Sequence, residues 1–203
     1  MSVELHKGDL PAGLDFGDFL AVDTETLGLN PHRDRLCLVQ LSAGDGNAHL
    51  VQFEKGLYKA PNLKAVLTNK KVTKIFHFGR FDLAMLLRYL DVFAEPVFCT
   101  KIASRLARTY TDRHGLKDLC RELLNVEISK QQQSSDWGAA ELTEAQREYA
   151  AADVLYLHRL REKLLAMLTR EGRLDLAEAC FRFLPHQAAL DLIGWADEDI
   201  FHH

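Results

Sequence analysis

The sequence predicts an α/β fold, with a mixed five-stranded sheet flanked by helices and a helical C-terminal part. Two patterns lead to this prediction. Short apolar runs separated by turn-forming residues fill the first half of the 203-residue chain, whereas apolar residues at helical spacing dominate the second half. Between them strands alternate with helices, which predicts parallel pairing because a parallel crossover has to accommodate a helix.

Three strands are predicted near the N-terminal end, at residues 19–24 (FLAVDT), 36–41 (LCLVQL) and 48–53 (AHLVQF). The links between them contain Gly-Leu-Asn-Pro at 28–31 and Gly-Asp-Gly-Asn at 44–47, both of which are turn compositions. Short turns connect neighbouring antiparallel strands, so these strands are expected to form a meander.

The middle of the chain alternates between helices and strands, and a proline at its start is a favourable first residue for a helix. The predicted order is a helix at 62–67, a strand at 72–78, a helix at 81–90, a strand at 97–99 and a helix from about Lys101.

No strand is predicted after Leu116. A polar loop at 127–140 leads into the longest predicted helix, which is expected to start at Thr143. Gln146, three positions later, completes a capping-box pattern, and Gly172 is a suitable stop.

The C-terminal part, residues 174–195, is expected to form two short helices broken at Pro185. No internal repeat or long linker divides the chain, and its length suits one domain. We therefore expect a single domain over residues 1–203, with the helices from about 174 as an extension.

Composition limits the classes of partner. The formal net charge is −4, whereas a protein that tracks a long duplex usually carries a broad basic surface. This favours a compact site and a small substrate. No apolar run approaches the roughly 20 residues of a membrane span, and no secretory signal is evident. The four cysteines are widely spaced, so buried thiols in a reducing cytoplasm are expected.

Asp23 and Glu25 lie two residues apart at the end of the first predicted strand, so period-2 geometry places both on one face. Two like charges there repel each other unless a cation lies between them. A solvated strand end is the alternative, but the apolar run before them indicates a buried strand that delivers both carboxylates to an edge of the sheet.

Asp82 follows a predicted strand across a tight Gly-Arg turn, where it is a candidate third carboxylate. The alternative is an ordinary acidic residue at a helix N-terminus. Tyr149 and Asp153 are four residues apart on the long helix and share a face, with three alanines between them. An ordinary pair on a helix is the alternative there.

Together the pattern is DxE, then an Asp after a strand, then YxxxD on a late helix. Mg²⁺ prefers oxygen ligands and keeps water or phosphate oxygens in its shell. Two divalent ions about 3.5–4 Å apart can stabilise both the attacking and leaving oxygens of a phosphodiester. The set therefore predicts metal-dependent hydrolysis, with Tyr149 orienting or deprotonating the attacking water.

These segments resemble the DEDD exonucleases, of the tyrosine-bearing subgroup in the ribonuclease D branch. The resemblance is carried by residues 22–26 (VDTET), 77–83 (HFGRFDL) and 149–153 (YAAAD), and by the loop 135–137 (SDW). Three ordered motifs over about 130 residues are far more specific than any one of them.

The sequence is most similar to the NrnC nanoribonucleases, through residues 21–29 (AVDTETLGL), 99–116 (CTKIASRLARTYTDRHGL) and 189–201 (ALDLIGWADEDIF). This resemblance implies an RNase H-like exonuclease fold, hydrolysis of short oligoribonucleotides including 5′-phosphorylated dinucleotides, and a ring-shaped homo-octamer. It also implies that two ions, Mg²⁺ or Mn²⁺, are held by Asp23, Glu25, Asp82 and Asp153, and that Tyr149 serves the attacking water.

Two departures from full-length ribonuclease D are expected to matter. The chain ends at residue 203, without room for the C-terminal nucleic-acid-binding domains of that enzyme. Cys99 stands where many relatives have Asp before Thr, and a thiolate suits softer metals, so it is not expected to be a ligand. Both departures favour short RNA over structured tRNA precursors.

Candidate substrate-binding residues surround these motifs. Thr24 lies between the first two carboxylates. Leu29, on the following turn, resembles a wedge between the last two bases, or else covers the core. His77 is a candidate contact for the scissile phosphate or terminal sugar, or else a core histidine.

A basic stripe follows at Lys101, Arg105 and Arg108, with Arg113 and His114 in the next loop. It is a candidate for recognition of a 5′-phosphate, with a subunit interface or a solvated basic face as alternatives. In the polar loop, Lys130, Gln133, Ser135 and Trp137 are candidates to line the substrate entrance, although Trp137 can equally anchor the loop.

Two rival functions remain open at this point. One is a general 3′-end trimming exonuclease for tRNA precursors or DNA ends. The other is a non-catalytic binding module on the same fold, which the presence of all four carboxylates and the tyrosine argues against.

Overall fold

The computed structural model describes residues 2–129 and 131–202. A mixed sheet of six strands lies at its centre, in the order β1-β4-β3-β2-β5-β6. The strands are β1 (Val3–Lys7), β2 (Phe19–Thr26), β3 (Leu36–Ser42), β4 (Ala48–Gln52), β5 (Thr73–Phe76) and β6 (Val97–Cys99).

The predicted meander is present, because β2, β3 and β4 pair antiparallel. The predicted parallel pairing is also present, since β5 joins β2 and β6 joins β5 in that sense. The expectation of five strands was wrong. A sixth strand, β1, pairs parallel with β4 at the edge of the sheet.

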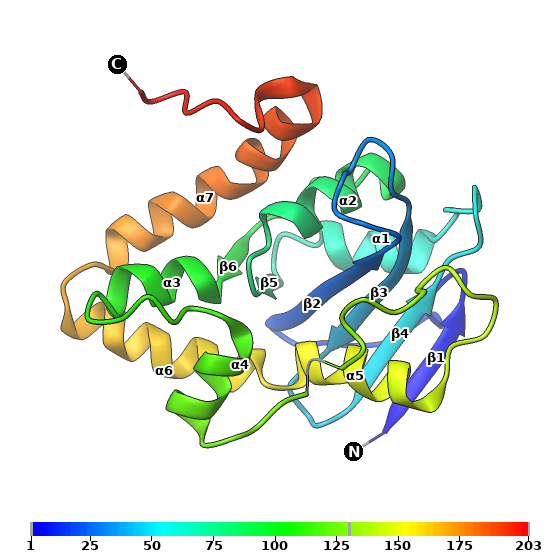
Figure 1. Cartoon of the computed structure of the whole chain (residues 1–203), viewed down its shortest axis with the longest axis horizontal. Coiled ribbons are helices and arrows are strands. Elements are labelled where there is room, and N and C mark those ends of the chain that lie inside the picture. Colours follow the sequence, from blue (N-terminus) through cyan, green and yellow to red (C-terminus); the bar gives the residue numbers. More distant parts are fainter. Residues whose placement is uncertain (1, 130, 203) are drawn as a thin grey trace.

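Helices cover both faces of the sheet and extend beyond its β6 edge (Figure 1). On one face, α5 (Glu144–Leu155) crosses β1 to β4. The opposite face carries α1 (Pro61–Thr68) and α2 (Arg80–Leu90), whose leucines belong to the larger apolar core. The other helices are α3 (Thr100–Ala107), α4 (Leu116–Leu119), α6 (Leu157–Arg170) and α7 (Leu174–Leu190), with π-helical turns at Cys120–Leu124 and Asp191–Trp195.

Two helix predictions need correction. The long helix from Thr143 is divided at Tyr156 into α5 and α6, because α5 packs on the sheet whereas α6 turns away to pack on α3. The C-terminal part is not broken at Pro185. Helix α7 continues through this proline, which is itself buried between α7 and its neighbours.

The cysteine prediction holds for three of the four thiols. Cys37, Cys99 and Cys120 are buried and free, whereas Cys180 is free but exposed on α7. Across the described residues, no helix is long and apolar enough to cross a membrane.

Candidate active site

Strand β2 carries the first two carboxylates to the end of the sheet. It lies between β3 and β5, so its position is fixed from both sides, and Leu20, Ala21 and Val22 are fully buried. Asp23 and Glu25 project on the same side of this strand. One carboxylate oxygen from each of Asp23, Glu25 and Asp153 lies within 4.8 Å of the other two.

Asp82 reaches the same place from α2. The turn that delivers it is tight, because a Cβ added at Gly79 would lie 2.6 Å from the Cβ of Phe76. Asp82 is buried, and the hydroxyl of Thr24 donates a hydrogen bond to it at 2.5 Å. Thr24 therefore positions the fourth carboxylate as well as lining the pocket.

The carboxylates strongly perturb one another. Burial, followed by the charges of Asp82, Asp153 and Glu25, holds the pKa of Asp23 well above its ordinary value. Burial and the charges of Asp153 and Asp82 raise the pKa of Glu25 to about 9. Burial also raises the pKa of Asp82 to about 7. A cluster of this kind favours a cation among its oxygens.

Helix α5 contributes Tyr149 and Asp153 on one face. Its start is fixed by the predicted capping box, in which Thr143 and Gln146 bond each other's backbone N–H. Ala150 and Ala151 are fully buried, which allows this helix to approach the sheet closely. Burial and the nearby carboxylates raise the pKa of Tyr149, and its hydroxyl is hydrogen-bonded to Asp153.

Gln40 is a site residue that the sequence interpretation missed. It lies opposite Asp23 in the β2–β3 pairing, and its side-chain amide donates to Asp23 Oδ2 at 3.2 Å. Its side chain is completely buried. The one available signal was a glutamine within the otherwise apolar run of β3.

The carboxylates lie in a pocket of about 660 Å³. Its lining combines acidic, apolar and basic side chains, so it can contact both the bases and the phosphates of a nucleic acid. Besides the carboxylates and Tyr149, the lining includes Thr24, Leu29, His77, Phe78, Lys101, Lys117 and Gln133.

Phe78 stands out in this lining. Its backbone is left-handed, with φ at 62°, a conformation that is unusual for a bulky residue. Its ring is half exposed, and the ammonium of Lys101 lies 3.6 Å from the ring centroid. Next to it, His77 contacts the Thr100 hydroxyl through Nδ1 at 2.9 Å. Residues held in rare backbone conformations tend to cluster at functional sites.

The C-terminal turn closes one side of the pocket. Arg80 forms two hydrogen bonds of 2.6 and 2.7 Å with the carboxylate of Asp191 and a third with the carbonyl of Ala196. All three residues line the pocket. The segment 191–196 is therefore held against the start of α2, close to Asp82.

Comparison with known proteins identifies the family. Residues 11–169 match the family model described as 3′-5′ exonuclease. The chain belongs to this family. It is also 40% identical to ribonuclease D of Acidiphilium cryptum over 157 residues, which cover 77% of this chain and 40% of the relative. The chain thus spans about two fifths of the length of such curated relatives.

Solved structures agree with this assignment. NrnC of Brucella melitensis bound to pGG matches with a TM-score of 0.97 and 60% identity, covering 100% of this chain and 99% of that one. The same protein with bound Mg²⁺ matches with a TM-score of 0.96 and 59% identity, covering all of both chains. Ribonuclease D of Escherichia coli matches with a TM-score of 0.74 and 29% identity, over 84% of this chain and 45% of the other.

The basic stripe is not assembled around the carboxylate pocket as predicted. Among its residues, only Lys101 lines the pocket, whereas Arg105, Arg108, Arg113 and His114 do not. Arg105 and Arg113 are exposed elsewhere, and His114 is half-buried against the Ser104 hydroxyl.

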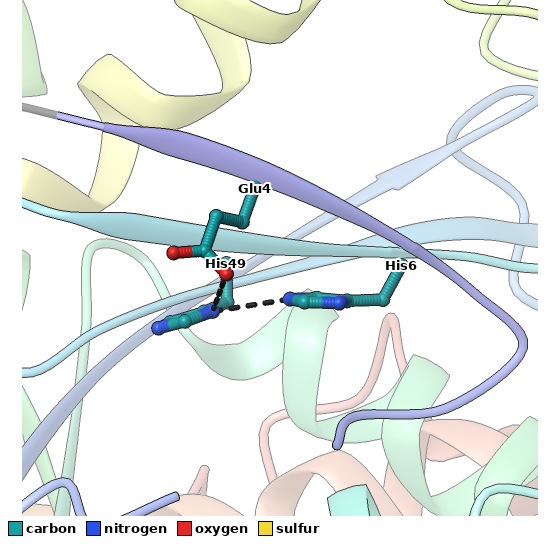
Figure 2. A group of neighbouring side chains, drawn as sticks. All are labelled: Glu4, His6 and His49. Atoms are coloured by element: carbon teal, nitrogen blue, oxygen red, sulfur yellow. Dashed lines mark hydrogen bonds and ion pairs between the residues drawn. The ribbon is translucent and has the colours of Figure 1, made fainter.

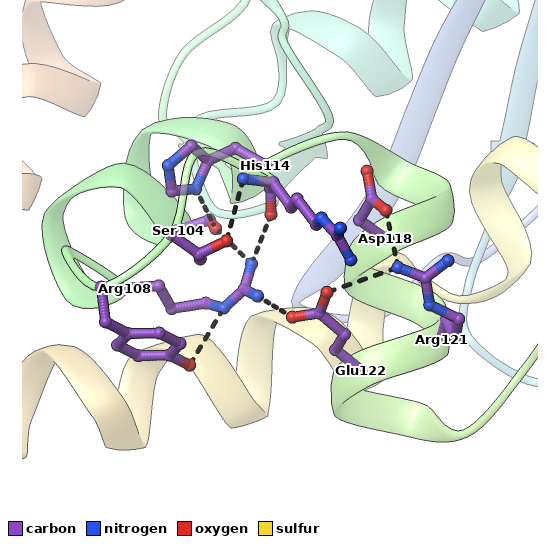
Figure 3. A network of polar contacts seen from close by, with 9 residues as sticks. Ser104, Arg108, His114, Asp118, Arg121 and Glu122 are labelled. Atoms are coloured by element: carbon purple, nitrogen blue, oxygen red, sulfur yellow. Dashed lines mark hydrogen bonds and ion pairs between the residues drawn. The ribbon is translucent and has the colours of Figure 1, made fainter.

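Arg108 is the clearest correction, because its side chain is 0% exposed. Figure 3 shows its guanidinium enclosed by a polar network. It forms an ion pair with Glu122 and donates to the Ser104 hydroxyl at 3.1 Å and to the Arg113 carbonyl at 2.8 Å. Arg108 therefore holds together α3, the following loop and the 120–124 turn, and it cannot reach a 5′-phosphate.

Trp137 also differs from its prediction as an entrance residue. It is buried in the smaller apolar cluster beneath α5, with Leu38 and Leu50, and its ring lies 6.0 Å from that of Tyr149. Trp137 therefore anchors the polar loop and packs against the ring of Tyr149. Gln133 does line the pocket, whereas Ser135 does not. Lys130 lies outside the described residues.

Proposed function

We propose that this protein is a metal-dependent 3′-5′ exoribonuclease that hydrolyses short oligoribonucleotides, above all 5′-phosphorylated dinucleotides, to mononucleotides. The observation that carries the proposal is the convergence of three carboxylates within 4.8 Å, with a fourth buried beside them, in a pocket that also offers exposed apolar and basic side chains.

The donor set fits Mg²⁺ or Mn²⁺. All the converging atoms are carboxylate oxygens, which suit these hard cations. Asp23, Glu25 and Asp153 would hold one ion, and Asp23 with Asp82 would hold a second. Bound there, divalent ions stabilise the charge that develops on the attacking and leaving oxygens of a phosphodiester. NrnC of Brucella melitensis is similar in this respect, since it has been solved with bound Mg²⁺.

The residues around the carboxylates orient the reacting groups. Gln40 holds Asp23 and Thr24 holds Asp82, so two of the acids have a fixed direction. The Tyr149 hydroxyl, held by Asp153, is placed to orient the attacking water. His77, held by Thr100, faces the pocket and contacts the phosphate or sugar of the terminal nucleotide.

Base recognition falls to two large exposed apolar residues of the pocket, Leu29 and Phe78, which are 85% and 53% exposed. Aromatic side chains stack on unpaired bases of any sequence. Leucine at position 29 extends from the turn after β2, where it can enter between the last two bases. A site that recognises two bases in this way suits a very short RNA, and NrnC of Brucella melitensis binds pGG.

We look for the 5′-phosphate contact among the described basic residues that line the pocket. Arg80 is already paired with Asp191, and Lys101 lies against Phe78. Lys117, at the start of α4, is therefore assigned as the residue that binds the 5′-phosphate of a dinucleotide. Removing the 5′-phosphate from a dinucleotide should weaken binding by about 1.5–3 kcal/mol, the energy of a charge-assisted hydrogen bond.

The decisive experiment is a cleavage time course with RNAs of two to about ten nucleotides, each with and without a 5′-phosphate. Loss of the phosphate should impair dinucleotide cleavage strongly and cleavage of a seven-nucleotide RNA very little. Lys117→Gln should remove this difference, whereas Lys163→Gln, an exposed lysine on α6, should preserve it. Equal phosphate effects at both lengths, or dinucleotide accumulating as an end product, would instead indicate general 3′-end trimming.

We further infer that residues 1–203 form a single exonuclease domain, because α7 packs on both α2 and β6. A cytoplasmic, ring-shaped homo-octamer is proposed from the resemblance to the NrnC proteins. Light scattering at working concentrations should give a mass of eight chains. A monomer would contradict the proposed assembly without affecting the hydrolytic chemistry.

A further inference from the structure

A second group of metal-ligating side chains lies on strands β1 and β4. These strands are at the edge of the sheet opposite β6, the strand that α7 contacts. Val3 and Leu5 of β1 pack toward the cluster beneath α5. Glu4 and His6 alternate with them and therefore project from the other face. His49 lies directly opposite Glu4 in the β1–β4 pairing, so all three side chains meet above one face of two strands.

The three groups are already close enough to share an ion. His6 Nε2 lies 3.1 Å from His49 Nδ1, and His49 Nδ1 lies 3.8 Å from a carboxylate oxygen of Glu4. Figure 2 shows the two imidazole rings edge to edge, with the Glu4 carboxylate beside His49. Nitrogen ligands bind zinc at about 2.0–2.1 Å, so two ligand atoms of one tetrahedral ion are roughly 3.3 Å apart.

We propose that Glu4, His6 and His49 form a binding site for a divalent transition-metal ion of the zinc type. Two imidazoles and one carboxylate are a common ligand set for Zn²⁺, and imidazole suits Zn²⁺, Co²⁺ and Ni²⁺ far better than Mg²⁺. The site shares no residue with the carboxylate pocket, so it does not depend on the proposed exonuclease function.

The surroundings of the two imidazoles favour metal binding. The ring of Phe16 packs edge-on against His49, with ring centroids 5.7 Å apart. Burial and the neighbouring His49 lower the pKa of His6, which favours the neutral ring that a metal requires. Binding requires that the proton between Nε2 of His6 and Nδ1 of His49 moves to a remote ring nitrogen and that both facing nitrogens turn toward the ion.

An ion bound at this site would hold the edge strand β1 to its neighbour β4. β1 pairs with β4 alone, so its attachment to the sheet rests on one ladder and a few side chains. Glu4 and His6 come from β1 and His49 from β4, so an ion joins the two strands directly. Because the ion binds the folded chain and not the separated strands, it raises the melting temperature.

The test is thermal unfolding of the full-length protein in excess Mg²⁺, with and without micromolar Zn²⁺, together with visible absorption on titration with Co²⁺. Excess Mg²⁺ is added to compete for the carboxylate pocket. Zn²⁺ should raise the melting temperature, and Co²⁺ should give tetrahedral absorption bands with one ion per chain. His6→Gln and His49→Gln should lose both signals, while His32→Gln, an exposed histidine elsewhere, should retain them.

Two further variants separate this site from other metal binders. Asp153→Asn disables the carboxylate cluster, and replacement of both His202 and His203 by Ala removes the terminal histidine pair. Both signals should survive in each. If either variant abolishes them, or if His6→Gln and His49→Gln keep the Co²⁺ bands, the proposed site does not exist. The Co²⁺ titration is made on folded protein, so it remains decisive even if a histidine variant is less stable.

Discussion

The carboxylate cluster around Asp23 and the network around Arg108 both bring ionisable groups together inside the molecule, but their surroundings differ completely. The charged neighbours that act on the pKa of Asp23 and Glu25 are other carboxylates. Arg108, in contrast, has an opposite charge in Glu122 and neutral acceptors in Ser104 and in the Arg113 carbonyl. The carboxylate cluster brings like charges together, whereas the charge of Arg108 is neutralised by Glu122.

This difference separates a binding site from a structural network. Like charges held together away from water are unfavourable unless a ligand of opposite charge joins them. A buried cation with a complete set of acceptors has nothing left to offer a ligand. The spacing of charged residues in the sequence therefore misleads when used alone, as the basic stripe shows. Whether a buried charge has a partner of opposite charge is the better indicator of function. The following predictions test that distinction.

The largest effect is expected at the cluster itself. Asp23→Asn keeps the volume of the side chain but removes a charge central to the metal site, so turnover should fall by at least about 10³-fold. Isothermal titration should show weaker Mg²⁺ binding. Asp45→Asn, at an exposed turn, is the matched control and should retain full activity. If Asp23→Asn retains turnover and metal affinity, the carboxylates do not form the catalytic centre.

A smaller loss is expected for Tyr149→Phe, which preserves the ring and its packing on Trp137 but removes the hydroxyl. Since general acid–base groups contribute about 10²–10⁴-fold, kcat should fall by about 10²-fold with little change in KM. Unchanged kcat would show that this tyrosine serves packing alone.

On the other side of the comparison, Glu122→Gln should lower stability without lowering activity per folded molecule. It leaves the fully buried Arg108 without its counter-charge, at a cost of about 2 kcal/mol in the free energy of unfolding. Glu171 is about as exposed as Glu122, but its partner Arg170 is exposed too, so Glu171→Gln should cost under about 1 kcal/mol. Urea unfolding measures both, and equal costs would remove the distinction between the two kinds of ion pair.

Much of the fold and of the carboxylate site follows from local sequence patterns. The strands of the meander are apolar runs between turns, and Thr143 with Gln146 marks a helix start that the structure reproduces. The carboxylate site could be predicted from the sequence because strand periodicity places Asp23 and Glu25 on one face. Helix periodicity does the same for Tyr149 and Asp153. Local spacing gives the direction of these side chains directly.

The predictions that were wrong, for β1 and for Arg108, have physical causes that cannot be read from the spacing of nearby residues. β1 has only Val3 and Leu5 as inward residues, and its partner β4 is 45 positions away in the chain. Helical spacing placed Arg108 beside Arg105, but α3 ends at Ala107 and the backbone of Arg108 has φ −112° and ψ 61°, which turns its side chain inward. Long-range pairing and helix termination are tertiary properties.

The smallest effect concerns the stability of the metal-free protein as a function of pH. The pKa values of Glu25, about 9, and Asp82, about 7, are both raised above their ordinary values of 4.5 and 3.8. Such groups stabilise the folded state while they are protonated, so their contribution is complete at low pH and is lost as pH rises through 7 and then 9.

Metal-free protein should therefore melt at a lower temperature at pH 9 than at pH 6, by roughly 2–4 °C for each kcal/mol lost. Saturating Mg²⁺ should flatten the dependence, because the cation replaces the protons as the partner of the carboxylates. Calorimetry in the presence of a chelator measures the slope, and Asp82→Asn should reduce the part of it near pH 7. If the slope is the same in Asp82→Asn, or persists unchanged in Mg²⁺, the repulsion that distinguishes this cluster from the Arg108 network is not its source.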